Sequence, residues 1–112
     1  MPELVYDRYF GNYTLVRNSD RKQAKANWQS ALNAKGYYCG EVDGIFGSKT
    51  ETETKNFQRA HGLEVDGKAG YNSKMAMFNL FFDENGVSQI NTYCRYLNDS
   101  QRDGTDYYDP DT

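Results

Sequence analysis

The sequence predicts a mainly α-helical fold: a small three-helix bundle with Gly/Asp corner loops, an N-terminal β-hairpin-like extension and an extra C-terminal helix. Three observations support this prediction. Apolar residues recur at helical spacing in several segments, glycine directly follows two of those segments, and one Asp/Gly-rich motif occurs twice, each time before a helical segment. The chain has 112 residues, the length of one domain, and its 15% of aromatic residues supply apolar area for a compact core.

Residues 1–17 are expected to form an extension that precedes the bundle. The run from Glu3 to Arg17 is rich in Tyr, Val, Leu and Phe, and Gly11-Asn12 lies in its middle. A Gly-Asn pair between two β-prone runs is typical of a hairpin turn. We therefore expect two short strands that are joined at Gly11-Asn12.

The bundle is placed within residues 18–82, and its first helix is expected to end before Gly36. Asn18, Ser19 and Asp20 offer an N-cap, and Asp20 with Gln23 resembles a capping box. One face of this helix carries the residues Ala24, Trp28, Ala31 and Leu32.

The second and third helices of the bundle follow the two corner loops. The sequence S-K-T-E at Ser48 to Glu51 reads as a capping box, and the helix that it opens should run to about His61, before Gly62. The apolar face of this helix is thin and consists of Thr54, Phe57 and Ala60. A third helix is expected over residues 71–82, where most positions after 74 are apolar.

The segment 83–98 is expected to add a fourth helix. After the break Asp83-Glu84-Asn85-Gly86, apolar residues recur at i, i+3, i+7 and i+10, namely Val87, Ile90, Cys94 and Leu97. Residues 99–112 contain five Asp and one Arg, and we expect this acidic tail to be mobile.

A ten-residue motif of the form E-V-D-G-x-x-G-x-x-[T/S] occupies residues 41–50 and again residues 64–73. The side chains of Asp43 and Asp66 can accept hydrogen bonds from backbone N–H groups two or three residues later, and glycine permits the positive φ that a tight turn needs. The hydroxyl that closes each copy is expected to help satisfy free N–H groups in the first turn of the next helix. The motif therefore predicts two similar corners, each of which leads into a helix.

This repeat belongs to a longer pattern of aromatic-Gln pairs, glycines and corner loops. The pattern comprises Trp28-Gln29, Ala31-Leu32, the run from Gly36 to Thr50, Phe57-Gln58, Gly62-Leu63 and the second corner up to Gly70. It resembles the pattern of peptidoglycan-binding domains of the three-helix type, over about residues 15–78. The chain departs from that family at Glu53 and Thr54, where small or branched apolar residues are usual.

The resemblance implies a non-catalytic module that binds bacterial peptidoglycan and brings a wall-lytic activity, on a partner or on a fused domain, to the murein. Similar domains are attached to amidases, transglycosylases, carboxypeptidases and phage endolysins. The resemblance also implies action at the cell wall, outside the cell, and no cofactor. The alternative is a protein-interaction module or a structural part of a phage or spore, with the aromatic N-terminal segment and the acidic tail as contact surfaces.

Four side chains near the corners are candidates for ligand contact: Tyr37, Tyr38, Gln58 and Arg59. We expect one of the two tyrosines to pack inward and the other to face solvent. At least one of Gln58 and Arg59 should project from the core. Because Tyr can stack on a sugar face and Arg can bind a carboxylate, Tyr38, Gln58 and Arg59 are expected to share a shallow groove.

No catalytic residue and no metal site is expected. The motif around Asp43 and Asp66 lacks the alternating oxygen ligands of a calcium loop, and His61 is the only histidine. A Cys–His nucleophile that pairs His61 with Cys39 or Cys94 is the least favoured alternative, left open because such pairs meet in space rather than in sequence.

The two cysteines leave two further alternatives open. If the fourth helix docks beside the first corner, Cys39 and Cys94 could form a disulfide at an oxidising cell surface. Otherwise Cys94 is a buried thiol and Cys39 is an exposed one, which is the alternative that we favour.

Charge and hydropathy exclude two classes of partner. Residues 1–98 hold 12 basic and 11 acidic side chains, so the chain lacks the basic stripe that nucleic acid needs. No apolar run is long enough to span a membrane, and the first 25 residues lack the apolar core of a secretory signal.

Overall fold

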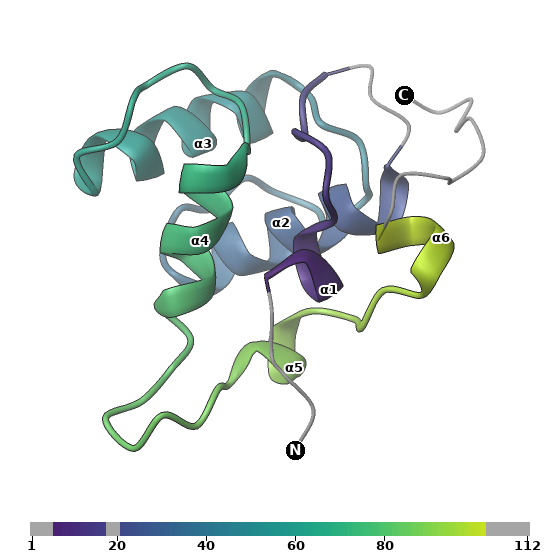
Figure 1. Ribbon diagram of the computed structural model, residues 1–112. Helices are drawn as coiled ribbons and strands as arrows, with labels where there is room; N and C mark the ends of the chain where they lie inside the picture. Colours follow the sequence, from purple (N-terminus) through teal and green to yellow (C-terminus); the bar gives the residue numbers. More distant parts are fainter. Residues whose placement is uncertain (1–5, 18–20, 103–112) are drawn as a thin grey trace.

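The computed structural model describes residues 6–17 and 21–102, and this part of the chain is mainly α-helical, as the sequence predicted. Its helices are α1 (Asp7–Phe10), α2 (Lys22–Ala34), α3 (Ser48–Ala60), α4 (Tyr71–Asn79), α5 (Ile90–Tyr93) and α6 (Asp99–Arg102). The central helix α2 contacts α1, α3, α5 and α6. In Figure 1, α3 and α4 lie together on one side, and α6 lies on the opposite side, next to α1. None of these helices is long and apolar enough to cross a bilayer.

The core is built around the indole ring of Trp28 on α2, which is fully buried. Its ring meets Phe10 and Phe57 edge-to-face, with ring centroids 5.4 Å and 5.8 Å apart. The indole Nε1 donates a hydrogen bond of 2.9 Å to Thr54 Oγ1, which in turn donates to the carbonyl of Thr50. A buried indole N–H needs an acceptor, so threonine at position 54 serves where an apolar residue could not.

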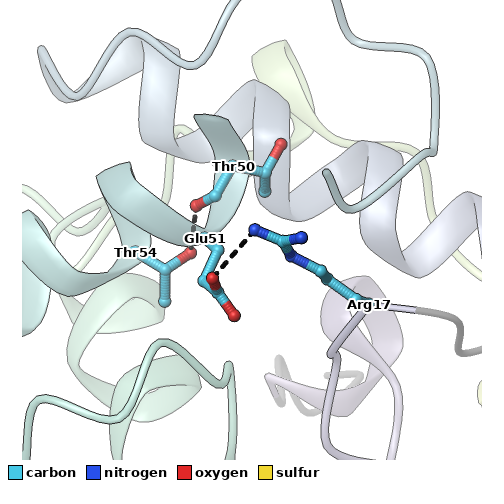
Figure 2. Close-up of polar contacts among 4 residues, drawn as sticks. All are labelled: Arg17, Thr50, Glu51 and Thr54. Atoms are coloured by element: carbon cyan, nitrogen blue, oxygen red, sulfur yellow. Dashed lines mark hydrogen bonds and ion pairs between the residues drawn. The ribbon is translucent and has the colours of Figure 1, made fainter. Parts of the chain in front are cut away.

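Figure 2 shows this part of α3 with the side chain of Arg17 beside it. Thr54 bonds Thr50 one helical turn earlier, and the guanidinium of Arg17 reaches Glu51 at 3.1 Å between Nη2 and Oε1. Both partners of this ion pair are partly exposed, so its contribution to stability is below about 1 kcal/mol. The pair ties the N-terminal segment to the start of α3.

The ends of α2 and α3 agree with the sequence prediction, and α3 begins at Ser48 as expected, but the predicted capping boxes are not formed. Tyr37 N–H donates to the Leu32 carbonyl, and Leu63 N–H donates to the Gln58 carbonyl, each at 2.8 Å, in the bond pattern of a helix that ends at glycine. The N-cap of α3 is Gly47, and no side chain caps the helix, so the capping box at Ser48 is wrong.

The first helix also begins without the predicted capping box. The N-cap of α2 is Arg21, which makes no capping bond with its side chain, and Gln23 donates to Asn27 Oδ1 instead. The other half of the predicted box, Asp20, lies outside the described residues, as do Asn18 and Ser19.

The N-terminal hairpin is wrong, because residues Asp7–Phe10 form the short helix α1. Tyr9 and Phe10 are neighbours in sequence and are both fully buried, whereas a strand would point them to opposite faces. After Gly11 the chain extends, and Leu15 forms an antiparallel bridge with Ala69, with both N–H···O bonds at 3.0 Å. The segment therefore pairs with the second corner loop rather than with itself.

The third helix, α4, ends at Asn79 and not at residue 82, because the chain turns back on itself there. Phe82 pairs with Ser88 in an antiparallel bridge, and Asp83 Oδ1 accepts bonds from the N–H groups of Asn85 and Val87. The Asn85-Gly86 pair thus lies in a tight hairpin turn, as Asn-Gly pairs favour.

The predicted fourth helix is reduced to the single turn of α5, and from Cys94 the chain is extended. The cause is Asn27, a buried residue of α2. Its Nδ2 donates to the carbonyls of Arg95 and Tyr9, each at 2.7 Å, and its Oδ1 accepts from Arg95 N–H at 2.9 Å. Because Asn27 bonds both backbone groups of Arg95, that residue has no need of helical partners.

A buried lysine on α4, Lys74, holds the N-terminal segment. Its Nζ donates to the carbonyls of Gly11, at 2.9 Å, and Tyr13. Burial lowers the pKa of Lys74 to about 7, and the nearby carboxylate of Asp7 only partly opposes this shift.

Through Lys74, the free energy of unfolding is expected to rise by about 1 kcal/mol per pH unit between about pH 7 and about pH 8.5. In this range the unfolded chain keeps the Lys74 proton, because its pKa there is about 10.4, while the folded protein releases it as the pH rises past about 7. Denaturant unfolding of the wild type and of Lys74→Met at about pH 7 and about pH 8.5 measures the pH dependence of the free energy of unfolding in each protein. Equal pH slopes in the two proteins would contradict the prediction.

Candidate functional site

Corner loop 1 (residues 41–47) is held by one buried side chain of α2, Gln29. Its Oε1 accepts from the N–H groups of Asp43 and Gly44, at 3.1 and 2.9 Å. Its Nε2 donates to Asp43 Oδ1, to the Ile45 carbonyl and to Thr50 Oγ1, at 2.9 to 3.1 Å. A single glutamine thus connects α2, the loop and the first turn of α3.

Corner loop 2 (residues 64–70) is held in the same way by Gln58 of α3. Its Oε1 accepts from the N–H groups of Asp66 and Gly67, at 3.1 and 2.9 Å. Its Nε2 donates to Asp66 Oδ1, to the Lys68 carbonyl and to Ser73 Oγ, at 2.8 to 3.0 Å. The two glutamine clamps therefore match bond for bond, and the hydroxyls of Thr50 and Ser73 accept from glutamine side chains.

The predicted role of the two aspartates within the loops is confirmed. Asp43 Oδ1 accepts from Ile45 N–H, and Asp66 Oδ1 accepts from Lys68 N–H, both at 2.9 Å. Although its partial burial alone would raise the pKa of Asp66, the hydrogen bonds from Lys68 N–H and the Gln58 amide outweigh this effect and lower the pKa.

The glycine after each aspartate is required by its surroundings. Gly44 and Gly67 have φ of +77° and +75°, and a Cβ on Gly44 would lie 2.6 Å from Lys22 Cγ. A Cβ on Gly67 would lie 2.9 Å from Glu51 Cγ. Each loop therefore lies directly on the first turn of the helix that carries its glutamine.

A small pocket opens at each corner loop. Pocket 1 has a volume of about 230 Å³ and lies between Gln29, corner loop 1 and the first turn of α3. Pocket 2 has a volume of about 220 Å³ and lies between Gln58, corner loop 2 and the first turn of α4. Eight of the nine residues that line each pocket have a counterpart in the other.

The two tyrosines before corner loop 1 divide as expected. Tyr37 packs inward against Phe57, with ring centroids 5.5 Å apart, while Tyr38 is 65% exposed. The Lys49 ammonium lies 5.4 Å from the centroid of the Tyr38 ring. Because Lys49 lines pocket 1, Tyr38 stands at the side of that pocket.

The shallow groove expected from Tyr38, Gln58 and Arg59 is not formed. Gln58 is 1% exposed and both of its polar atoms are bonded within the protein, so it is not available to a ligand. Arg59 is exposed and bonds Asn56 Oδ1, but it lies ten residues along α3 from Lys49, which is about 15 Å of helix.

Residues 21–77 match the family described as "Putative peptidoglycan binding domain". The chain belongs to the peptidoglycan-binding domain family. The matched residues contain both glutamine clamps, both corner loops and both pockets. The described residues on either side of the match, 6–17 and 78–102, pack onto this family domain through α1, α5 and α6.

Individual relatives of this peptidoglycan-binding domain are spore cortex-lytic enzymes. The enzyme from Bacillus cereus is 38% identical over 68 residues, which are 61% of this chain and 26% of the enzyme. The enzyme from Oceanobacillus iheyensis is 44% identical over 46 residues, which are 41% of this chain and 17% of that protein. The chain thus spans about a quarter or less of the length of these relatives.

A solved structure has the same fold. The crystal structure of the SleB N-terminal domain is 37% identical in sequence and superimposes with a TM-score of 0.60, covering 63% of this chain and 96% of that domain. The peptidoglycan-binding domain here thus corresponds to almost the whole of the SleB N-terminal domain, and the chain adds residues beyond it.

The two cysteines of the chain are both buried and both free, so Cys39 is not the exposed thiol that we favoured. Cys39 Sγ donates to the Gln29 carbonyl and Cys94 Sγ donates to the Asn27 carbonyl, so no disulfide joins them. Burial raises the pKa of both thiols, to about 12 for Cys94, which disfavours the thiolate that a nucleophile needs. The His61 ring lies against Phe57, with centroids 4.5 Å apart.

The residues that the sequence argument missed are Gln29, Glu41, Glu64, Lys49 and Lys68. The signal for the glutamines was present, because Trp28-Gln29 and Phe57-Gln58 are two aromatic-Gln pairs, each upstream of one copy of the motif. The signal for the glutamates was the motif itself, whose first residue is Glu in both copies.

Proposed function

We propose that this chain is a non-catalytic module that binds bacterial peptidoglycan and brings a lytic activity, on a partner or on a fused domain, onto the cell wall. The observation that carries the proposal is the family match at residues 21–77, which contains two pockets built by the same clamp. The relatives named spore cortex-lytic enzymes support a link to wall lysis. The module would then act outside the cell, at the wall.

The contact surface that we propose includes Tyr38 and the adjoining pocket 1. The Tyr38 ring is the most exposed aromatic ring among the described residues, and the Lys49 ammonium lies over one of its two faces. An aromatic face can stack on the C–H groups of a sugar while the phenol hydroxyl donates a hydrogen bond. Lys49 adds a cation for a carboxylate of the wall peptides.

The substitution Tyr38→Ala is expected to weaken binding to purified sacculi about tenfold, a loss of about 1.4 kcal/mol, because it removes the stacking face. Co-sedimentation of the protein with insoluble sacculi, over a range of protein concentrations, measures the affinity. The matched control is Tyr13→Ala, since Tyr13 is 51% exposed and also carries a cation, Arg21, over its ring.

One outcome would contradict the binding function, and another would contradict only the contact surface. If wild-type protein does not sediment with sacculi of several wall chemotypes, the binding function is wrong. If it sediments and Tyr38→Ala behaves like Tyr13→Ala, the function stands but the contact surface lies elsewhere.

A further inference from the structure

The repeated motif contains two residues that the folding of the loops does not explain. The aspartate and the glycine of each copy are explained, because Asp43 and Asp66 bond the loop backbone and the glycines have positive φ. The preceding Glu and Val are not explained in this way. An internal repeat that keeps residues without a folding role indicates that they serve contact with something else.

Both glutamates are exposed and have free carboxylates. Within residues 6–17 and 21–102, neither Glu41 nor Glu64 forms a hydrogen bond or an ion pair. The valines beside them, Val42 and Val65, are 49% and 41% exposed, although valine gains from burial. Each corner loop therefore presents a carboxylate next to apolar methyl groups.

The similarity of the two loops extends to their surfaces. At each of the ten motif positions, the residue in one copy has the same degree of burial as its counterpart in the other. Glu41 lines pocket 1 and Glu64 lines pocket 2. The two copies thus place their glutamates equivalently, each at the edge of a pocket of nearly the same volume.

Each pocket also has one lysine, although at different positions of the motif. Lys49 lines pocket 1 and Lys68 lines pocket 2, and both are exposed. A carboxylate and an ammonium at one pocket are complementary to a ligand that carries a free ammonium and a free carboxylate. The short peptides of peptidoglycan are ligands of this class, and they recur along the polymer.

We propose that pockets 1 and 2 are two equivalent subsites, in which Glu41 and Glu64 each bind the ammonium group of one wall peptide. This inference rests on the proposed function and adds the ligand class and the number of subsites. Two linked subsites bind a repeating polymer more tightly than either alone, because the second contact is intramolecular.

The test uses a purified disaccharide-tetrapeptide with a free amine, released from sacculi by a muramidase, and the full chain labelled with ¹⁵N. On titration, the backbone N–H signals of both Val42 and Val65 are expected to shift. In Glu41→Gln the response at Val42 should weaken at least tenfold while Val65 responds as before, and Glu64→Gln should show the reverse. Acetylation of the peptide amine should abolish both responses.

Binding to sacculi supplies a second readout. The double variant Glu41→Gln/Glu64→Gln is expected to lose more than tenfold in affinity, and each single variant should lie between it and the wild type. The matched control is Glu84→Gln, which changes an exposed carboxylate in the turn after α4. Because both loop glutamates are exposed and unbonded, the melting temperatures of all variants should equal that of the wild type.

The possible results distinguish failure of the proposed function from failure of the two-subsite inference. If wild-type protein fails to sediment with sacculi, the proposed function itself is wrong. If it sediments but only one loop responds to the fragment, or neither does, or the double variant binds as well as Glu84→Gln, the two-subsite inference is overturned and the proposed function remains.

Discussion

Substituting Gln58 with alanine is expected to lower the free energy of unfolding by about 4 kcal/mol. The side chain is 1% exposed and makes five hydrogen bonds: its Oε1 accepts two from loop N–H groups, and its Nε2 donates the other three. Alanine would remove all five bonds, and of the partner residues Gly67 and Ser73 are buried, where a polar group left without a bond costs about 1–3 kcal/mol unless water reaches it.

Chemical denaturation of wild type and variant, monitored by circular dichroism, measures this loss. Gln58→Glu tests the amide donor alone, because glutamate has nearly the size of glutamine and keeps the acceptor oxygen. It replaces the donor with a carboxylate beside Asp66. The control is Gln101→Ala, because the side-chain oxygen of Gln101 accepts one exposed hydrogen bond, from Asn98 N–H. A loss below about 1 kcal/mol for Gln58→Ala would show that the clamp does not hold corner loop 2.

Phe57→Ala is expected to cost about 3–5 kcal/mol, because it opens a cavity at the centre of the core. The ring is fully buried and contacts the rings of Trp28, Tyr37 and His61, at centroid distances of 5.8, 5.5 and 4.5 Å. Domains of this size have about 5–15 kcal/mol in total, so the variant is expected to melt far below the wild type.

The milder variant Phe57→Leu keeps the measurement within range if Phe57→Ala does not fold. It should lie between the wild type and Phe57→Ala in thermal and denaturant unfolding. Val87→Ala is the surface control, since Val87 is 54% exposed, and it should change the free energy of unfolding by less than about 0.5 kcal/mol. If Phe57→Ala matched this control, the arrangement of α2 and α3 would be wrong.

The parts of the fold that the sequence predicted well are those that depend on local signals. Glycine after the last helical turn located the ends of α2 and α3, and the repeated Asp/Gly motif predicted two similar loops. These features depend on the backbone preferences of a few neighbouring residues, which are visible in one sequence. The different exposure of Tyr37 and Tyr38 was also predicted locally, because two neighbours on a loop beside a core are seldom both buried.

The parts that failed depend on contacts between distant residues. The apolar spacing of Ile90, Cys94 and Leu97 is helical, but Asn27 binds both backbone groups of Arg95 and ends the helix after one turn. Likewise, Gln58 is polar and was expected to line a surface groove, whereas its burial becomes favourable only after corner loop 2 and Ser73 of α4 supply its partners. A partner 68 residues away leaves no mark on the local pattern.

The helix α3 carries parts of both pockets, since Thr50 closes one clamp and Gln58 forms the other. Between them lie eight residue steps without glycine or proline, which fix their separation along the helix axis at about 12 Å. A rigid spacer of this kind cannot stretch toward a ligand whose repeat is longer or shorter. If both pockets bind the wall as proposed, any mismatch must be absorbed by the flexible polymer at the expense of its own conformational entropy. The length of α3 would then select which spacings along the wall fill both pockets at once.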